Sequence, residues 1–174
     1  MSFAAILPVW NGRNLLARLL DTLDTQTLPI DDLIVIDNGS TDGAPDLARA
    51  RGARAIPMGH NAGFAAAINR GLEEAQADYI AILNSDVELS PNYFATLIAS
   101  LEETKSWFAT GKIVSIHNPG QLDATFDLTS RGAATWRAGN ARPDSPTFAQ
   151  RREIYSAPLT AAVFRSVVFA ELKK

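Results

Sequence analysis

The most informative stretch of the sequence is Tyr79-Ile80-Ala81-Ile82-Leu83-Asn84-Ser85-Asp86-Val87-Glu88, in which an apolar run changes abruptly into polar and acidic residues. Residues 79–83 have the composition of a buried strand, and the polar side chains begin where that strand ends. In open α/β sheets, ligands bind at the edge where the strands end. A carboxylate at that edge needs a metal ion, a basic residue or a helix N-terminus as its partner. The stretch therefore predicts a ligand site at the end of a buried strand.

Strands and helices alternate through the first half of the chain. Strand-like apolar segments cover residues 3–7, which Pro8 is expected to stop, and residues 33–36, 53–57 and 79–83. Helical patterns cover residues 13–25, with one face of leucines at 15, 16, 19, 20 and 23, residues 42–51, a stripe through Phe64, Ile68, Leu72 and Ala75, and residues 91–104, opening at Pro91. This alternation predicts a doubly wound α/β fold, a mostly parallel sheet with helices on both faces. Right-handed crossovers place the strand ends along one edge.

The pattern loosens after residue 117. Residues 109–117 predict one more strand, and residues 118–150, rich in Pro, Gly, Asn, Ser and Thr, are either a long excursion covering a site or a poorly ordered loop. Residues 159–165 are expected to return as a strand, and Ser166 to cap a last helix over residues 167–174. No terminator follows that helix, so we expect a truncated chain. Alternatively, Lys173 and Lys174 finish the helix against its dipole.

Composition narrows the classes of function. The chain has 174 residues, 47% of them hydrophobic, a length and balance that suit one globular domain. A net charge of −3 argues against nucleic-acid binding. The absence of cysteine excludes disulfides and thiolate metal sites, and two histidines are too few for a histidine-based metal centre. The sequence shows no signal peptide and no apolar run of about 20 residues, so a cytoplasmic location is expected. A position at the inner face of the membrane is the alternative.

Two polar clusters follow the first two predicted strands. In residues 8–12 (PVWNG), Trp10 can pack on a base or sugar, although a core tryptophan in an ordinary turn is the alternative. In residues 37–43 (DNGSTDG), Asp37 can accept hydrogen bonds from a base or ribose, while Ser40, Thr41 or Asp42 caps the next helix. The glycine spacing is not that of a Rossmann element, and a plain capped turn stays open.

Two further clusters follow the later strands. Asn61 opens a helix and can cap it or contact a ligand, whereas Arg70 on the helix body is more typical of a solvated surface than of a diphosphate clamp. Asn84, Ser85 and Asp86 offer oxygen ligands of the kind that Mg²⁺ or Mn²⁺ prefers. The alternative is that Asp86 only caps the turn that follows.

In this order, the four motifs resemble those of the family-two inverting glycosyltransferases, which have the GT-A nucleotide-diphospho-sugar transferase fold, with the rhamnosyltransferase-like branch nearest. The match is strong over residues 3–91 and weaker over residues 156–172. The resemblance implies that Asp86 binds Mg²⁺ or Mn²⁺. It also implies that the nucleotide-sugar is bound by Pro8, Val9, Trp10, Asn11, Asp37, Asn38, Asn61, Gly63, Asn84 and Ser85.

This sequence departs from the family at two places. Asn84 stands where the metal motif normally begins with an acid, which leaves Asp86 as the principal ligand. The catalytic base of the family is expected to lie beyond residue 174, so the catalytic residue stays unassigned. None of Asp123, Asp127 and Glu153 occupies that motif.

The resemblance implies transfer of a sugar from a nucleotide diphosphate-sugar donor to a saccharide or lipid-linked acceptor hydroxyl, with inversion, in the synthesis of cell-surface polysaccharide or glycoconjugate. Residues 1–117 are expected to form the nucleotide-sugar-binding half of a single domain, and residues 118–174 a partial acceptor-side half. Peripheral membrane association and a homo-oligomer stay open. Two alternatives remain: a nucleotide-sugar-binding module without a catalytic base, and a nucleotidyltransferase. The latter ranks last because the sequence lacks a glycine-, arginine- and lysine-containing loop for a triphosphate.

Overall fold

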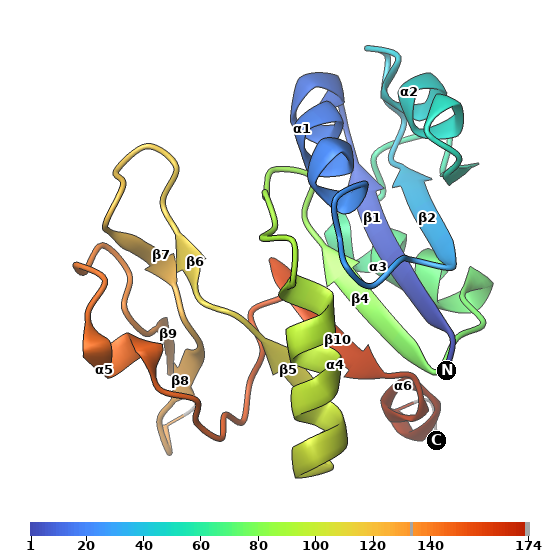
Figure 1. Cartoon of the computed structure of the whole chain (residues 1–174). Helices are drawn as coiled ribbons and strands as arrows, with labels where there is room; N and C mark the ends of the chain where they lie inside the picture. Colours follow the sequence, from blue (N-terminus) through green and yellow to red (C-terminus); the bar gives the residue numbers. More distant parts are fainter. Residues whose placement is uncertain (133, 173–174) are drawn as a thin grey trace.

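A six-stranded sheet forms the centre of the protein, and helices cover both of its faces (Figure 1). The computed structural model describes residues 1–132 and 134–172. In chain order the elements are β1 (Phe3–Val9), α1 (Arg13–Leu23), β2 (Asp32–Asp37), α2 (Ala44–Ala50), β3 (Arg54–Pro57), α3 (Phe64–Glu74), β4 (Tyr79–Leu83), α4 (Tyr93–Thr104), β5 (Phe108–Thr110), β6 (Ile113–Val114), β7 (Leu122–Ala124), β8 (Asp127–Thr129), β9 (Thr135–Arg137), α5 (Pro146–Ala149), β10 (Ala161–Arg165) and α6 (Val167–Leu172).

The strand order is β3-β2-β1-β4-β10-β5, and the first four of these strands are parallel. Strand β10 runs antiparallel between β4 and β5. Side chains alternate between two cores: Ile6 and Ile68 lie in one, beside α3, and Leu7 and Leu16 lie in the other, beside α1. Both faces are apolar because both are covered. The predicted doubly wound, mostly parallel α/β fold is confirmed.

The prediction that Pro8 ends the first strand was wrong. Strand β1 continues through Pro8 to Val9, and both residues keep their parallel register with β2. The register of β1 with β4 covers only Phe3 to Ile6, so Pro8 has a neighbouring strand on one side alone. Proline is tolerated where a strand has an unpaired side, because no ladder hydrogen bond is lost there.

The helices are confirmed, but not every member of their predicted stripes is buried. Leu15 of α1 is 39% exposed and Phe64 of α3 is 42% exposed. Helix α3 meets the sheet through Ile68 of the stripe and through small residues. A Cβ added at Gly71 would lie only 2.3 Å from Cγ2 of Ile6. Helix α4 begins at Tyr93 rather than at the predicted Pro91, with Asn92 as its N-cap.

The single strand predicted over residues 109–117 was also wrong. The segment divides into β5, which pairs with β10, and β6, which pairs with β7 outside the central sheet. Gly111 lies at the break, and its N–H donates to the Tyr93 hydroxyl at 3.1 Å while that hydroxyl donates to the Ala161 carbonyl at 2.8 Å. These bonds replace strand pairing where the chain leaves the sheet.

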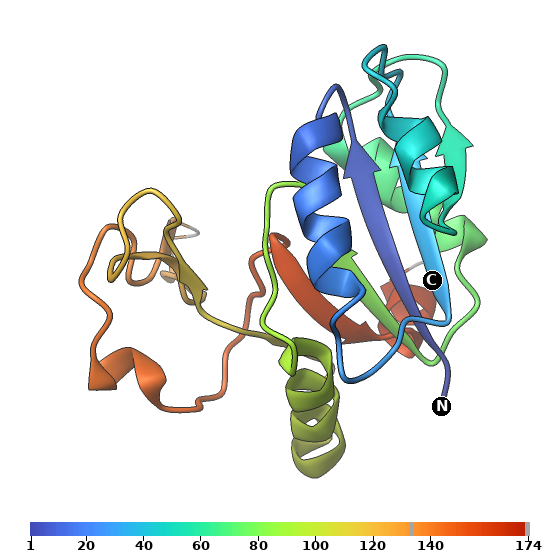
Figure 2. The same cartoon turned by 45° about the horizontal axis from the view of Figure 1, so that its top comes forward.

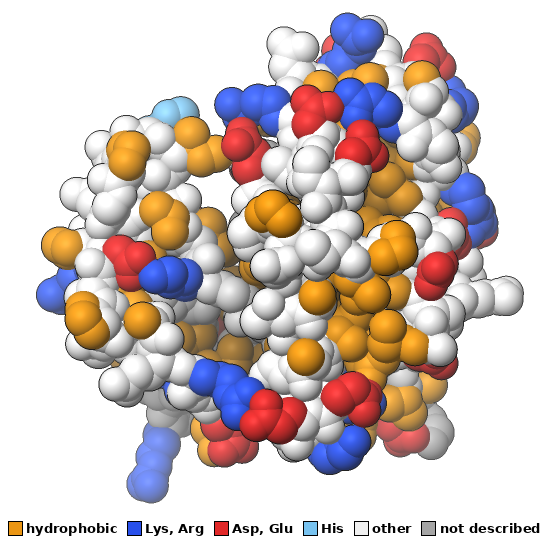
Figure 3. All heavy atoms as spheres, in the orientation of Figure 1, with side chains coloured by type: hydrophobic (Ala, Val, Ile, Leu, Met, Phe, Trp, Pro, Cys, Tyr) orange, Lys and Arg blue, Asp and Glu red, His pale blue; other side chains and the backbone are white. Residues whose placement is uncertain are grey.

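Residues 113–132 and 134–155 form a side lobe that lies beyond α4 in two views (Figures 1 and 2). Within it, residues 118–150 contain short strands and the helix α5, so the segment is neither a plain loop nor a cover over the strand ends of the sheet. A hollow of about 1550 Å³ separates the lobe from α4 (Figure 3). Arg151 crosses from the lobe to Glu103 of α4 with two hydrogen bonds, at 2.7 and 2.8 Å.

The chain then returns as β10 and α6, as predicted, although Lys173 and Lys174 of the predicted last helix lie outside the described residues. None of the helices within residues 1–132 and 134–172 has the length and apolar character needed to cross a membrane.

Candidate functional site

Four loops meet at the carboxyl ends of the parallel strands, at the upper end of the sheet in Figure 1. We call them loop 1 (residues 10–12), loop 2 (residues 38–43), loop 3 (residues 58–63) and loop 4 (residues 84–92). Loops 1 and 4 are neighbours, since a Cβ on Gly12 would lie 3.6 Å from the Ser85 hydroxyl oxygen. Loops 2 and 3 touch, since a Cβ on Gly39 would lie 2.9 Å from Cα of His60. The four predicted clusters are therefore brought to one edge.

Asn11 connects loops 1 and 2. Its backbone has the left-handed φ of 50°, and its N–H donates to the Ser40 hydroxyl at 3.1 Å. Its side-chain oxygen accepts a hydrogen bond of 2.8 Å from the Thr41 N–H. Part of the Asn11 side chain, which was predicted to bind the donor, is therefore used to hold loop 2 in place.

Asp42 bonds to the first N–H of two helices. Its carboxylate accepts hydrogen bonds from the N–H of Arg13, the first residue of α1, at 2.8 Å, and from the N–H of Ala44, the first residue of α2, at 3.0 Å. These bonds, the one from Arg13 most of all, lower the pKa of Asp42 below its ordinary value. Asp42, one of the three residues predicted to cap the second helix, bonds to the first N–H of that helix, although the N-cap position belongs to Gly43. The bond to α1 joins residues 29 positions apart, so no local motif predicts it.

Asp37 lies at the last position of β2 and is only 7% exposed. Its Oδ1 accepts a hydrogen bond of 2.8 Å from the Ser40 N–H, which closes the turn of loop 2. In the described part of the chain, every fully buried side-chain oxygen has a hydrogen-bond partner. Asp37 Oδ2 has no such partner among the described residues, so it is not fully buried. Oδ2 therefore keeps access to solvent at the strand end, where it can accept a hydrogen bond from a ligand.

Asn38 is 5% exposed and uses both ends of its amide within the protein. Its Nδ2 donates to the Gly63 carbonyl at 3.3 Å, and its Oδ1 accepts from the Ala62 N–H at 3.4 Å. Asn61 accepts a hydrogen bond of 3.0 Å from the Gly63 N–H, which shapes loop 3 just before α3. Asn38, predicted as a donor-binding residue, is thus placed as the link between loops 2 and 3.

The residues of the first cluster differ in exposure. Pro8 and Val9 are buried within β1, and the Val9 carbonyl accepts a hydrogen bond of 2.8 Å from the Asn38 N–H. Trp10 is 58% exposed, which contradicts the alternative of a core tryptophan. Its ring is therefore available to pack against a base or a sugar at this edge.

Loop 4 carries the predicted metal ligand. The Asn84 N–H donates to the Thr160 carbonyl at 2.8 Å, which fixes the point where loop 4 leaves β4. The Asp86 side chain is exposed, and it has no ion pair within residues 1–132 and 134–172. Glu88 pairs with Arg18 of α1 at 3.4 Å, which holds the far side of loop 4.

The residues at loop 4 fit one kind of metal site. In the described part of the chain, no group of three or more histidine, aspartate or glutamate residues could hold a metal ion. Mg²⁺ keeps several waters and takes one or two carboxylates together with substrate phosphates, so it needs no protein cage. Asp86, with the oxygens of Asn84 and Ser85 beside it, fits a cation that is bound jointly with a diphosphate.

Arg70 and Arg13 differ in how well the sequence predicted their places. Arg70 pairs with Glu74 at 2.6 Å and belongs to the surface of α3, as its interpretation as a solvated residue suggested. Arg13 was not predicted, yet its side chain lies along loop 2, with Nε 3.7 Å from the place of a Cβ on Gly43. A single arginine at a helix start carries no sequence signal that separates it from other surface arginines.

Three comparisons with known proteins bear on this arrangement. The model of the family described as Glycosyl transferase family 2 matches residues 4–160. Glycosyltransferase GlyA of Streptococcus pneumoniae is 30% identical over 120 residues, which cover 64% of this chain and 17% of GlyA.

Solved structures share the fold. S. aureus TarS (residues 1–349) in complex with UDP superposes with a TM-score of 0.73 at 19% identity, covering 99% of this chain and 49% of that one. The mannosyltransferase PcManGT from Pyrobaculum calidifontis, in complex with GDP-Man and Mn²⁺, superposes with a TM-score of 0.67 at 17% identity, covering 98% and 46%. This chain therefore spans about half the length of those two structures and a smaller part of GlyA.

Proposed function

Because the chain belongs to glycosyl transferase family 2, we propose that it takes part in transferring a sugar from a nucleotide diphosphate-sugar donor to an acceptor hydroxyl, with inversion at the anomeric carbon. In this reaction the acceptor oxygen attacks the anomeric carbon, the bond from that carbon to the diphosphate breaks, and the diphosphate leaves. The acceptor loses its proton to a general base that we do not assign to a residue.

Asp37 carries the proposal. It is a buried carboxylate at the end of a parallel strand, with one oxygen fixed by Ser40 and the other able to reach a ligand. A group held so firmly can distinguish hydrogen-bond donors of a base or ribose, because the side chain loses little freedom on binding. We propose that Asp37 Oδ2 accepts hydrogen bonds from the nucleoside and that Trp10 packs against the same ligand.

Asp86 is the proposed protein ligand of a divalent cation, Mg²⁺ or Mn²⁺. When bound, such a cation supplies positive charge beside the diphosphate, where negative charge grows as the sugar leaves. The presence of Mn²⁺ in the PcManGT complex supports this assignment. Asn84 and Ser85 lie next to Asp86 in loop 4 and are proposed to line the donor site with Asn61 and Gly63 of loop 3.

A role in the synthesis of cell-surface polysaccharide or glycoconjugate is a further proposal. It is supported by the resemblance of the four motifs to the rhamnosyltransferase-like branch of the family. The acceptor would then be a saccharide or lipid-linked saccharide. Because no carboxylate is assigned as the base, we expect this chain to bind donor more readily than it turns donor over.

The test is nucleotide binding by calorimetry with UDP and GDP, with and without Mn²⁺. Asp37→Asn keeps an oxygen for Ser40 but removes the charge, so nucleotide affinity should fall by about 1.5–3 kcal/mol. The matched control is Asp46→Asn, which changes an exposed aspartate of α2 that pairs with Arg49. Equal affinity of the wild type and Asp37→Asn would reassign Asp37 to the turn alone.

A second measurement separates the classes of function. With nucleotide-sugars and simple saccharide acceptors, release of nucleoside diphosphate supports glycosyl transfer, whereas release of pyrophosphate indicates a nucleotidyltransferase. Binding without either product supports a nucleotide-sugar-binding module. Rapid transfer by this chain would place the base among its own carboxylates, such as Asp123 or Asp127.

A further inference from the structure

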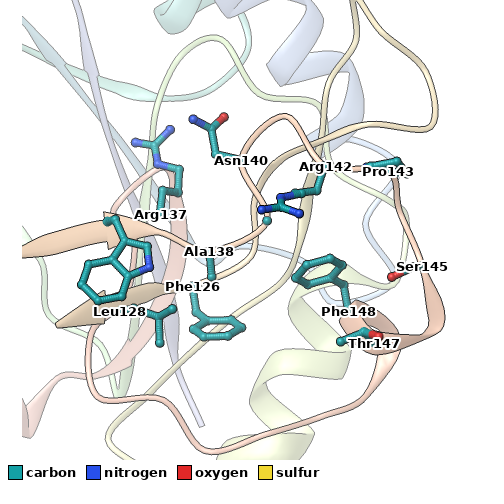
Figure 4. A pocket seen from close by; sticks show the side chains of 12 residues that line it. Phe126, Leu128, Arg137, Ala138, Asn140, Arg142, Pro143, Ser145, Thr147 and Phe148 are labelled. Carbon is teal, nitrogen blue, oxygen red and sulfur yellow. The ribbon is translucent and has the colours of Figure 1, made fainter. Parts of the chain in front are cut away.

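The side lobe contains a pocket that none of the four loops reaches. It has a volume of about 660 Å³ and lies between β8, β9 and α5 (Figure 4). Volumes of about 300–1,000 Å³ are typical of small-molecule sites. Phe126, Phe148 and Trp136 of β9 line it. Trp136 is 53% exposed although it borders a pocket, so its ring can still be covered by a ligand.

The pocket is positively charged. Arg137 and Arg142 line it, and no aspartate or glutamate does. Arg137 forms an ion pair with Asp123, at 3.3 Å. The Arg142 guanidinium has no hydrogen bond or ion pair within residues 1–132 and 134–172, and Figure 4 shows its side chain among those that line the pocket. A guanidinium without a partner, beside aromatic rings, suits an anionic ligand with an apolar face.

The residues that line the pocket are held in place by contacts with one another and with neighbouring residues. Arg152 lies over the Phe126 ring at 4.9 Å and donates a hydrogen bond of 2.5 Å to the Thr147 carbonyl. Gly139 has a φ of 78°, and a Cβ there would come within 3.3 Å of Phe148 and of Thr125. The turn after β9 therefore packs closely against α5, so the pocket is formed before any ligand enters, which lowers the entropic cost of binding.

We propose that this pocket binds a phosphorylated saccharide, with the sugar ring on Trp136 and the phosphate on Arg142. A sugar ring has a C–H face that packs on an aromatic ring and hydroxyls that need polar partners, which Asn140 and Ser145 provide at the pocket. A phosphate accepts paired hydrogen bonds from the planar guanidinium fork. The identification of this ligand as the acceptor rests on the function proposed above. Its binding in the side lobe is independent of that function.

Indole N–H signals in a ¹⁵N NMR spectrum give a test with the unmodified chain, because its three tryptophans lie at different places: Trp10 at loop 1, Trp107 beside β5 and Trp136 at the pocket. Titration with glucose 1-phosphate should shift the Trp136 signal, and titration with UDP should shift the Trp10 signal. Trp107, 55% exposed, should respond to neither ligand. A methyl phosphodiester of the same sugar separates a free sugar phosphate from a phosphate inside a longer chain, and a Trp136 shift with either one supports the site.

Variants test the two contacts separately. Arg142→Gln and Trp136→Ala should each weaken glucose 1-phosphate binding at least about tenfold, the effect of losing one charge-assisted or stacking contact. Arg131→Gln and Trp107→Ala are matched controls, because both side chains are exposed and neither lines the pocket. Thermal unfolding of each variant shows whether the variant folds. If Trp136→Ala does not fold, the titration of the wild type with glucose 1-phosphate tests the contact with Trp136.

Three results would overturn the inference. The first is no shift of the Trp136 signal up to about 10 mM glucose 1-phosphate, a concentration at which even weak ligands bind. The others are an equal shift with inorganic phosphate alone, and an equal loss of glucose 1-phosphate affinity in the control variants. Failure of the function proposed above has a different signature, since then UDP would leave Trp10 unchanged whatever happens at Trp136.

Discussion

Gly39 is the residue at which loop 2 comes closest to loop 3, and Gly39→Ala should lower both stability and nucleotide affinity. Its φ is 82°, a left-handed conformation that costs an alanine about 1–2 kcal/mol. The added Cβ would also lie 2.9 Å from Cα and 3.2 Å from C and N of His60, which are backbone atoms that cannot rotate away. Overpacking of this kind costs about 1–3 kcal/mol. The total expected loss in the free energy of unfolding is about 2–5 kcal/mol.

Gly52 offers a matched control, because it has a φ of 80° and nothing within 4 Å of an added Cβ. Gly52→Ala should therefore show only the conformational cost of about 1–2 kcal/mol. Urea denaturation measures both variants, with equal m-values as the condition for comparing them. Calorimetry with UDP should show weaker binding for Gly39→Ala alone, since loops 2 and 3 must separate to admit the methyl group. Equal destabilisation of the two variants would refute the steric reasoning.

The remaining predictions concern loop 4 and the packing of the sheet. Asp86→Ala should abolish the gain in UDP affinity that Mn²⁺ gives while leaving the melting temperature nearly unchanged; a metal effect that persists in the variant would remove Asp86 from the metal site. Gly71→Ala should destabilise the protein by up to about 2 kcal/mol in urea denaturation, because overpacking against Ile6 at 2.3 Å costs about 1–3 kcal/mol and the helix propensity of alanine offsets about 1 kcal/mol of that cost. The Tyr79 hydroxyl donates to Glu102 and is the main cause that lowers the pKa of Glu102 from 4.5 to about 2. The lowered pKa stabilises the fold above pH 4.5, so the difference in melting temperature between wild type and Glu102→Gln should shrink as pH falls from 4.5 to 2.

Sequence reasoning predicted the parallel part of the sheet well, because buried strands of this kind are continuous apolar runs. Strand β4 was predicted with its exact bounds, Tyr79–Leu83. The same reasoning placed the candidate ligand residues at strand ends, and parallel topology brought those ends together. What it could not give was the set of hydrogen bonds between loops that are distant in sequence, such as those of Asn11 to Thr41 and Asn38 to Gly63.

The second half was predicted less well because its elements are short. Strands β7, β8 and β9 have three residues each, too few to show an alternation of apolar and polar side chains. The break between β5 and β6 depends on the Tyr93 hydroxyl, a tertiary contact that no local pattern reveals. The pocket of the side lobe escaped prediction for the same reason, since Trp136 and Arg142 resemble isolated surface residues in the sequence.

Strand β10 has a consequence for how the protein folds during synthesis. It inserts antiparallel between β4 and β5, pairing Ala161 with Leu83 and Phe164 with Phe108. Until residue 165 has left the ribosome, β4 is therefore an open edge, and β5 has no partner in the sheet. Pairing of strands that are so distant in sequence is slow, and an open apolar edge invites association with other chains. A nascent chain that stops within the side lobe should thus need a chaperone, whereas release of β10 should cover the edge of β4 and give β5 its partner.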